Sequence, residues 1–191
     1  MKIAIIGNGN IGFGLAGVLA QAGHDVIAHG RDADIGAAVR GAELVILATP
    51  YGAAADLAAK ADFAGKVVVD VSNPITEDFS GLQVGHDSSA AEEIAKLLPG
   101  ASVVKAFNTI FAQHYATGLT VAGKPLQTFV AADDEIAREK VKRLAAEIGL
   151  SVVDAGPLKN ARYLEPLGFL NIQFGYVLCQ GTEIAPQWQA A

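Results

Sequence analysis

The first twelve residues constrain this chain most, because they predict a strand, a glycine-rich turn and a helix in that order. Residues 3–6 are an apolar run typical of a buried strand, and Gly7, Gly9 and Gly12 follow with the spacing G-x-G-x-x-G. In dinucleotide folds such glycines permit a tight turn, close approach of a pyrophosphate to the backbone, and close packing of helix on strand. We therefore predict that the turn binds a pyrophosphate at the start of the helix. Its residues are Gly7, Asn8, Gly9, Asn10, Ile11 and Gly12.

The end of the second predicted strand indicates which dinucleotide binds. Sites selective for NAD usually have an acidic residue there, because its carboxylate bonds both ribose hydroxyls. This chain has His29 and Gly30 instead, and Arg31 follows. A guanidinium pairs two phosphate oxygens at once, so Arg31 suits the 2′-phosphate of NADP. The sequence favours NADP over NAD, but two readings stay open. Asp32 or Asp34 could turn toward the ribose, and Arg31 could be a solvated charge paired with Asp32.

Composition excludes several classes of protein. The chain has 191 residues, of which 51% are hydrophobic, so it is long and apolar enough to bury a core. A net charge of −6 argues against a nucleic-acid-binding surface. The single cysteine, Cys179, excludes an intramolecular disulfide, and we expect it to be a buried thiol on a helix. The chain starts with a strand and has no apolar run of membrane-spanning length, so we expect a cytoplasmic protein without a membrane partner.

Strands alternate with helical segments along nearly the whole chain. The predicted strands are residues 3–6, 24–29, 43–48, 66–71, 101–107, 127–131 and 151–154. The predicted helices after the first are residues 33–40, 51–60, 88–98, 134–148 and 159–179, and the helix at 33–40 is expected to be short. Because the strands are nearly continuous Val and Ile runs, we expect a mainly parallel sheet with helices on both faces. This pattern predicts a doubly wound, Rossmann-type α/β fold, with residues 1–191 as one domain and 158–191 as its C-terminal helix and tail.

Polar residues at the carboxyl ends of the strands are the candidate site residues, because ligands of this fold bind there. Outside the glycine turn, the candidates are Thr49, Pro50, Tyr51, Asn73, Pro74, Asn108 and Thr109. Thr49 and Asn73 are placed to reach a pyrophosphate, a ribose or a carboxamide. Thr-Pro and Asn-Pro also begin ordinary turns, so a purely structural role stays open for both.

The sequence has no evident set of side chains for moving a proton, and its four histidines lack the spacing of metal ligands, so no metal site is predicted. His114 is a weak catalytic candidate near a cleft; an ordinary surface or helix-end histidine is the simpler reading. A dehydrogenase that acts on an alcohol needs an acid or base for the substrate proton. Hydride transfer between two bound redox cofactors needs far less, so the sequence favours that chemistry.

Four segments taken together resemble one known family. They are MKIAIIGNGNIGFGLAGVLAQAGHDV, VVVDVSNPI, SSAAEEIAKLLPGASVVKAFNTI and VVDAGPLKNARYLEPLGFLNIQF. Over nearly its whole length the chain resembles the NADPH-dependent coenzyme F420 (deazaflavin) reductases, and the reductase domain of the membrane ferric reductases looks like a relative.

The resemblance implies reversible hydride transfer between NADP(H) and a flavin-type partner, F420 or a flavin such as FMN or FAD. It also implies a place for each matching residue. Arg31 would face the 2′-phosphate, Thr49, Pro50, Asn73 and Pro74 would lie beside the nicotinamide, and Asn108 and Thr109 would lie near the deazaflavin.

Two other functions and one assembly stay open. The chain could be a non-catalytic sensor that binds a dinucleotide, or a small-molecule dehydrogenase or imine reductase with His114 or Tyr163 as proton donor. The last predicted helix is apolar around much of its circumference and needs burial on several sides. A homodimer would supply that burial, as would packing within one subunit.

Overall fold

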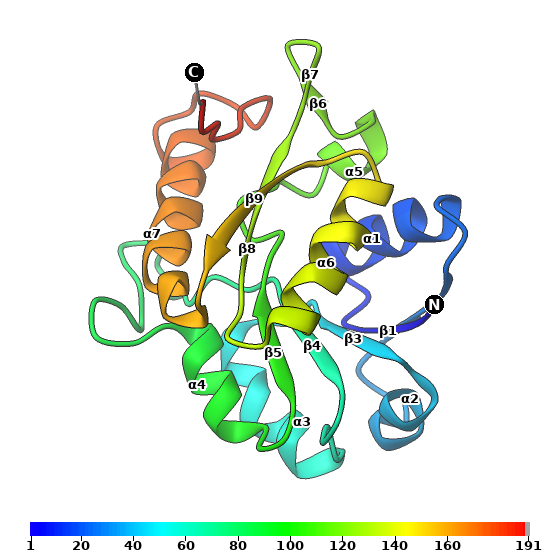
Figure 1. Ribbon diagram of the computed structural model, residues 1–191. Helices are drawn as coiled ribbons and strands as arrows, with labels where there is room; N and C mark the ends of the chain where they lie inside the picture. The colour runs from blue at the N-terminus through cyan, green and yellow to red at the C-terminus, as the bar shows by residue number, and fades with distance from the viewer. Residues whose placement is uncertain (190–191) are drawn as a thin grey trace.

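The computed structural model describes residues 1–189, and a seven-stranded sheet organises them (Figure 1). The strands are β1 (Lys2–Ile6), β2 (Asp25–His29), β3 (Leu44–Leu47), β4 (Val67–Asp70), β5 (Ser102–Lys105), β6 (Thr120–Val121), β7 (Lys124–Pro125), β8 (Gln127–Ala131) and β9 (Ser151–Gly156). The α-helices are α1 (Asn10–Gln21), α2 (Ile35–Gly41), α3 (Ala54–Lys60), α4 (Ala90–Leu97), α5 (His114–Thr117), α6 (Glu135–Glu147) and α7 (Ala161–Ile172). Two short 3₁₀ segments, η1 (Tyr51–Ala53) and η2 (Leu158–Asn160), precede α3 and α7, and a π-helical segment, η3 (Gln173–Val177), continues α7.

The sheet has the strand order β2-β1-β3-β4-β5-β8-β9, and β6 and β7 form a separate hairpin. Neighbouring strands are parallel except β5 and β8, which run antiparallel. The sheet is thus mainly parallel with helices on both faces, which confirms the Rossmann-type doubly wound fold. The carboxyl ends of β1 to β5 lie along one edge, and the strand order reverses between β1 and β3. Ligands of such sheets bind in the crevice at that reversal.

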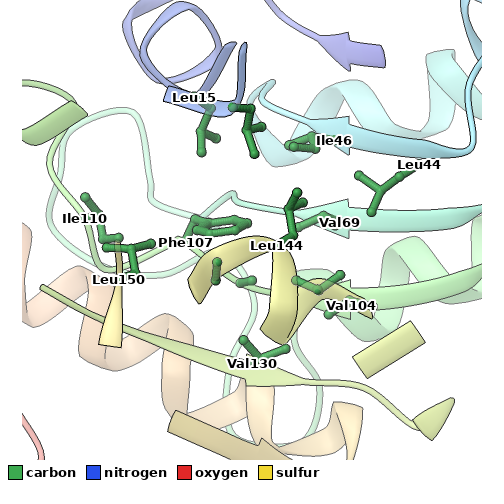
Figure 2. Close-up of a cluster of buried hydrophobic side chains, with 14 of the residues drawn as sticks. Leu15, Leu44, Ile46, Val69, Val104, Phe107, Ile110, Val130, Leu144 and Leu150 are labelled. Atoms are coloured by element: carbon green, nitrogen blue, oxygen red, sulfur yellow. The ribbon is translucent and has the colours of Figure 1, made fainter. Parts of the chain in front are cut away.

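Helices cover the two faces of the sheet through separate apolar cores. On one face α1 and α6 pack on the sheet through a cluster that includes Leu15 and Leu144 (Figure 2). On the other face α3 and α4 pack through a cluster that includes Leu57 and Ile94. Figure 2 shows the Phe107 ring among the aliphatic side chains of the first cluster. The backbone that follows β5 is therefore anchored in the core.

The second helix is short, as predicted, and its start explains one of the acidic residues near Arg31. α2 has seven residues. Asp34 is its N-cap, and Oδ1 of Asp34 accepts a hydrogen bond from the N–H of Ala37 at 2.9 Å. This carboxylate therefore satisfies a backbone donor at the helix start, which is the usual work of an N-cap aspartate.

The structure corrects three details expected from the sequence. β5 ends at Lys105 rather than at Phe107, because Phe107 has a φ of 62° and the chain turns there. The helix predicted over 159–179 is divided into η2, α7 and η3, since its last turn widens to π-helical geometry. Cys179 is exposed, not buried on a helix: it lies beyond η3 and has a φ of 55°, which ends the helical run.

Within residues 1–189 no helix is both long and apolar enough to span a bilayer. In the same part of the chain, His, Cys, Asp and Glu side chains do not gather in groups of three or more that could hold a metal ion.

Candidate functional site

The turn between β1 and α1 has the geometry of an anion-binding site. Gly7 has a φ of 113°, and a Cβ there would lie 2.3 Å from the carbonyl oxygen of Ala48. A Cβ on Gly12 would lie 1.9 Å from the carbonyl oxygen of Gly7, so only glycine lets α1 start this close to β1. Gly9 is the N-cap of α1, and in the described structure no side chain caps this helix end or adds an acidic group to its first turn. The first N–H groups of α1 are thus left for an anion such as a pyrophosphate.

The end of β2 presents a guanidinium to solvent. Arg31 lies two residues beyond β2 and is exposed. Gly30, between the strand and Arg31, lies against the glycine turn, since a Cβ on it would be 2.8 Å from Nδ2 of Asn8. Arg31 therefore stands beside the anion-binding turn, and the carboxylate of Asp34 is bonded to its own helix.

A cleft of about 390 Å³ opens at the carboxyl edge of the sheet, between the start of α1, the loops after β3, β4 and β5, and α7 with η3. The sequence-predicted residues that line it are Asn10, Ile11, Thr49, Pro50, Asn73, Asn108 and Thr109. The fold therefore brings these seven residues, which come from separate segments of the sequence, into one cleft. A second hollow, of about 460 Å³, lies between β2 and α2, away from the loops after β3, β4 and β5.

The loops after β4 and β5 are joined by their asparagines. Nδ2 of Asn73 donates to the carbonyl oxygen of Asn108 at 2.8 Å, and Nδ2 of Asn108 donates to Oδ1 of Asn73 at 2.9 Å. Nδ2 of Asn108 also donates to the carbonyl oxygen of Leu164 on α7, at 2.8 Å. α7 approaches this pair at Gly168, where a Cβ would lie 2.6 Å from Oδ1 of Asn73. The loops after β4 and β5 and the helix α7 therefore contact one another at the side-chain amides of Asn73 and Asn108.

Phe107 has a strained backbone conformation that positions the next residue, Asn108. A bulky residue with positive φ is uncommon and persists where its surroundings hold it. Here the ring is buried in the core, and the Phe107 N–H donates to Oγ1 of Thr128 at 3.0 Å. This left-handed residue reverses the chain after β5 and sets Asn108 at the cleft.

Beside these amides lies a buried ionic cluster. Nζ of Lys105 donates to Oδ2 of Asp70 at 2.7 Å, lies 2.9 Å from Oε1 of Glu165, and donates to the carbonyl oxygen of Ser72. Burial raises the pKa of Glu165, and the adjacent Lys105 charge opposes that rise. Burial likewise raises the pKa of Tyr51, and the charges of Glu93 and Glu165 raise it further, so the Tyr51 phenol stays neutral.

Several predicted residues lie outside the cleft lining. Arg31 and the turn residues Asn8 and Gly9 are exposed, and Pro74 is buried. Tyr51 starts η1 and is half-buried.

His114 and Tyr163 do not line the cleft either. His114 starts α5, which agrees with the helix-end alternative, but it is fully buried, so the surface alternative is wrong. The four-residue α5 packs against α1, and the Phe111 ring lies 6.5 Å from the His114 ring between centroids, so this helix end faces the interior. Tyr163 is 73% exposed on α7.

Sequence reasoning missed the contribution of α7 and η3. Gly168, Asn171, Ile172 and Tyr176 line the cleft, and Nδ2 of Asn171 donates to the carbonyl oxygen of Thr109 at 3.1 Å. It also missed the ionic cluster. A signal was present: Asp70 and Lys105 each end a run of valines, where a charge is unexpected in a buried strand.

Three residues of the cleft lining each have a buried polar atom without a hydrogen-bond partner in the described part of the chain. Ser72 Oγ, Asn108 Oδ1 and Thr109 Oγ1 are buried and have no hydrogen-bond partner within residues 1–189. A buried polar group left unpaired costs free energy, so a ligand that bonds these atoms would recover it. They offer an acceptor and two hydroxyls, which match a carboxamide or the dione ring of a flavin.

Comparison with known sequences gives relatives of two kinds. A sequence model of the family described as NADP oxidoreductase, coenzyme F420-dependent, matches residues 2–37. The F420-dependent NADP reductase of Methanothermobacter marburgensis is 34% identical over 202 residues, which cover 87% of this chain and 89% of that protein. The metalloreductase STEAP3 of Rattus norvegicus is 30% identical over 181 residues. That match covers 87% of this chain but only 36% of the metalloreductase.

A solved structure shares the whole architecture. It is a crystal structure from Arthrobacter sp. FB24, provisionally named an F420-dependent NADP reductase. It matches this chain with a TM-score of 0.85 and 28% sequence identity, and the match covers 96% of each chain.

Proposed function

We propose that this chain, which belongs to the family of F420-dependent NADP reductases, transfers hydride between NADPH and a deazaflavin of the F420 type. In this proposal the turn at Gly9 and the start of α1 bind the pyrophosphate, and Arg31 binds the 2′-phosphate. The nicotinamide lies in the cleft beside Thr49 and Asn73. NADPH supplies the hydride and the deazaflavin accepts it.

One observation carries the proposal: the cleft lining has no Asp, Glu, Lys, Arg or His among the described residues, and Tyr176 is the titratable side chain that it does contain. A carbonyl or imine substrate needs a positioned acid or base for its proton. Transfer between two redox rings needs alignment and exclusion of water instead. Reduction of the deazaflavin also consumes one proton, which we assign to solvent.

The remaining lining suits two planar rings. Ile110, Phe111, Ile172 and Tyr176 give an apolar wall, and the ring of Phe111 meets that of Tyr176 edge to face at 5.4 Å between centroids. Buried polar atoms of Ser72, Asn108 and Thr109 supply the few bonds that would fix ring orientation.

The test is anaerobic mixing of the purified protein with NADPH and oxidised F420. We expect the nicotinamide and deazaflavin absorbance bands to fall together in equal molar amounts. A Gly9→Asp variant is the inactive control, because it puts a negative charge at the anion site and its Cβ meets nothing within 4 Å.

Three other outcomes are informative. Turnover with FMN or FAD but not with F420 would change the acceptor and keep the reaction class. NADPH binding in calorimetry without turnover of any acceptor would favour a non-catalytic sensor that binds the dinucleotide. Turnover with a small imine or carbonyl alone would favour a small-molecule dehydrogenase or imine reductase.

Two further predictions belong to this proposal. We propose a cytoplasmic location and a homodimer in which apolar residues of α7 and η3, such as Leu170 and Val177, are covered by a second subunit; both residues are exposed here. Cell fractionation and light scattering test these predictions.

A further inference from the structure

Three ionisable side chains are buried together beside the cleft, and none of them lines it. Lys105 ends β5, Asp70 ends β4, and the two are register partners in the sheet. Glu165 comes from α7. The Lys105 and Asp70 side chains are fully buried and that of Glu165 is 1% exposed. Because packed apolar residues are often at least as stable as a buried ionic cluster, stability alone does not explain these charges.

The ammonium of Lys105 has three neighbouring oxygens. Nζ of Lys105 donates hydrogen bonds to Oδ2 of Asp70 and to the carbonyl oxygen of Ser72, and it forms an ion pair with Oε1 of Glu165. The second carboxylate has its own partners: the oxygens of Glu165 accept hydrogen bonds at 2.8 and 3.1 Å from the N–H groups of the first two residues of α4. The positive end of α4 therefore compensates the excess negative charge.

The cluster holds the loop after β4 from two sides. The N–H of Ser72 donates to Oδ1 of Asp70 at 2.9 Å, and the carbonyl of Ser72 accepts from Lys105. The next residue is Asn73, whose amide is paired with Asn108, three residues after Lys105. One ammonium thus fixes both chain segments that carry the amide pair.

Glu165 ties the helix that forms the third wall. It precedes Gly168 by three residues on α7, and Gly168 is the point where the helix touches the asparagine amides. Glu165 binds Lys105 and the start of α4, so the distance of α7 from the amide pair depends on the cluster.

We propose that Lys105 is a positioning residue for hydride transfer: held by Asp70 and Glu165, it fixes Ser72 and thereby the Asn73–Asn108 amide pair at the cleft. The catalytic part of this inference rests on the proposed function. The structural part does not, because the chain's own residues form the amide pair.

The variant that tests it is Lys105→Met with Asp70→Asn. Methionine has nearly the length of lysine, and the double change removes one positive and one negative charge, so the net charge of the cluster is kept. The new asparagine retains Oδ1 as acceptor for Ser72, and Glu165 retains its two backbone donors. What is lost is the ammonium that binds Ser72 and Glu165.

The matched control is Lys142→Met with Asp154→Asn. Lys142 also binds two carboxylates, Oε1 of Glu139 at 2.6 Å and Oδ2 of Asp154 at 2.9 Å, but it is partly exposed on α6 and does not line the cleft. A general effect of losing a lysine with two acidic partners would appear in both double variants.

Two readouts separate positioning from stability. In the ligand-free protein, side-chain amide NMR signals of Asn73 and Asn108 report the hydrogen-bonded pair, and we expect them to shift or broaden in the Lys105 variant only. In single-turnover reduction of F420, we expect hydride transfer to slow on the order of 10- to 100-fold, as a misplacement of about 1 Å does. The Kd of NADPH should change less than about threefold, because the anion-binding turn is unaltered.

Unchanged amide signals and an unchanged transfer rate in the folded variant would overturn the inference, as would equal losses in the control. If wild-type protein transfers hydride to no acceptor, the proposed function fails, and the amide signals alone decide the inference.

If the double variant does not fold, Asp70→Asn alone leaves Lys105 and Glu165 as a balanced pair with an amide facing the ammonium. It should give the same changes in smaller measure, and wild-type signals in that variant would count against the inference.

Discussion

Asn73 and Asn108 bind each other through two hydrogen bonds that fix the orientation of both amides. Nδ2 of Asn73 donates to the main-chain carbonyl of Asn108 at 2.8 Å, and Nδ2 of Asn108 donates to Oδ1 of Asn73 at 2.9 Å. Oδ1 of Asn108 is left as a buried acceptor beside the cleft. The loops after β4 and β5 therefore act as one rigid wall.

Gly168→Ala should disturb this wall. Its Cβ would lie 2.6 Å from Oδ1 of Asn73 and 2.9 Å from Nδ2 of Asn108, so the amides or α7 must move. We expect hydride transfer to slow about tenfold or more. We also expect the free energy of unfolding, from chemical denaturation, to fall by about 1–3 kcal/mol. In the control, Gly17→Ala on α1, the methyl meets nothing within 4 Å, so it should stabilise the fold by about 0.5–1 kcal/mol. Wild-type transfer by Gly168→Ala would show that this close approach is dispensable.

Two glycines of the turn should respond differently to the same substitution. Gly12→Ala puts a methyl 1.9 Å from the carbonyl oxygen of Gly7, so we expect a large loss of thermal stability. Gly9→Ala has open space and a φ of −71°, so stability should fall by less than about 1 kcal/mol. NADPH affinity should still fall, because the methyl occupies space that the pyrophosphate needs. Calorimetry and thermal denaturation of both variants check this, and equal NADPH affinity in wild type and Gly9→Ala would speak against binding at the turn.

Arg31→Ala should weaken NADPH binding and leave NADH binding unchanged. A charge-assisted hydrogen bond contributes about 1.5–3 kcal/mol, so the Kd of NADPH should rise roughly 10- to 150-fold. Titration with both nucleotides measures the ratio. Arg143→Ala, an exposed change on α6, is the control. A similar loss for both nucleotides would mean that Arg31 does not read the 2′-phosphate.

Glu92→Gln should destabilise the protein in a pH-dependent way. Nε and Nη2 of Arg162 donate to Glu92 at 2.9 and 2.7 Å and hold the pKa of this carboxyl below its usual range. A pKa lowered by folding adds stability above the unfolded value, about 4.3 for glutamate, and that stability is lost as the pH falls through the folded value.

The cost of Glu92→Gln should thus be roughly 1–2 kcal/mol near neutral pH. It should shrink toward zero in acid below the folded-state pKa. Urea denaturation across this pH range measures it, with Glu183→Gln, an exposed change in the tail, as the control. A cost that is the same at every pH would contradict the assigned ion pair.

His114→Gln and Tyr163→Phe should both keep wild-type turnover of F420. His114 is fully buried, Tyr163 is exposed, and neither lines the cleft. Steady-state rates of the two variants check this. A loss of orders of magnitude in either one would favour a dehydrogenase or imine reductase with that residue as proton donor.

Much of the site could be predicted because it depends on local pattern. The glycine spacing between an apolar run and a helix is a property of twelve consecutive residues. Parallel strands bring their carboxyl ends to one edge, so Thr49, Asn73 and Asn108 could be placed together from the strand ends alone. The short α2 was predictable from the few residues between β2 and β3.

The sequence by itself determined the order of the seven strands of the main sheet and of the helices other than α5, the glycine turn, and the polar residues at the strand ends, because each follows from neighbouring residues. The short α5 and the β6–β7 hairpin were not predicted. Only the tertiary structure decided that Lys105, Asp70 and Glu165 share one buried cluster and that Gly168 meets Asn73. Those contacts depend on the register of β5 against β4 and on the packing of α7, whose hydrogen bond from Asn108 to Leu164 joins residues 56 apart in the sequence. Contacts between residues far apart in the sequence leave no local sequence pattern. The wall of the cleft formed by α7 and the asparagine loops could therefore be identified only from the tertiary structure.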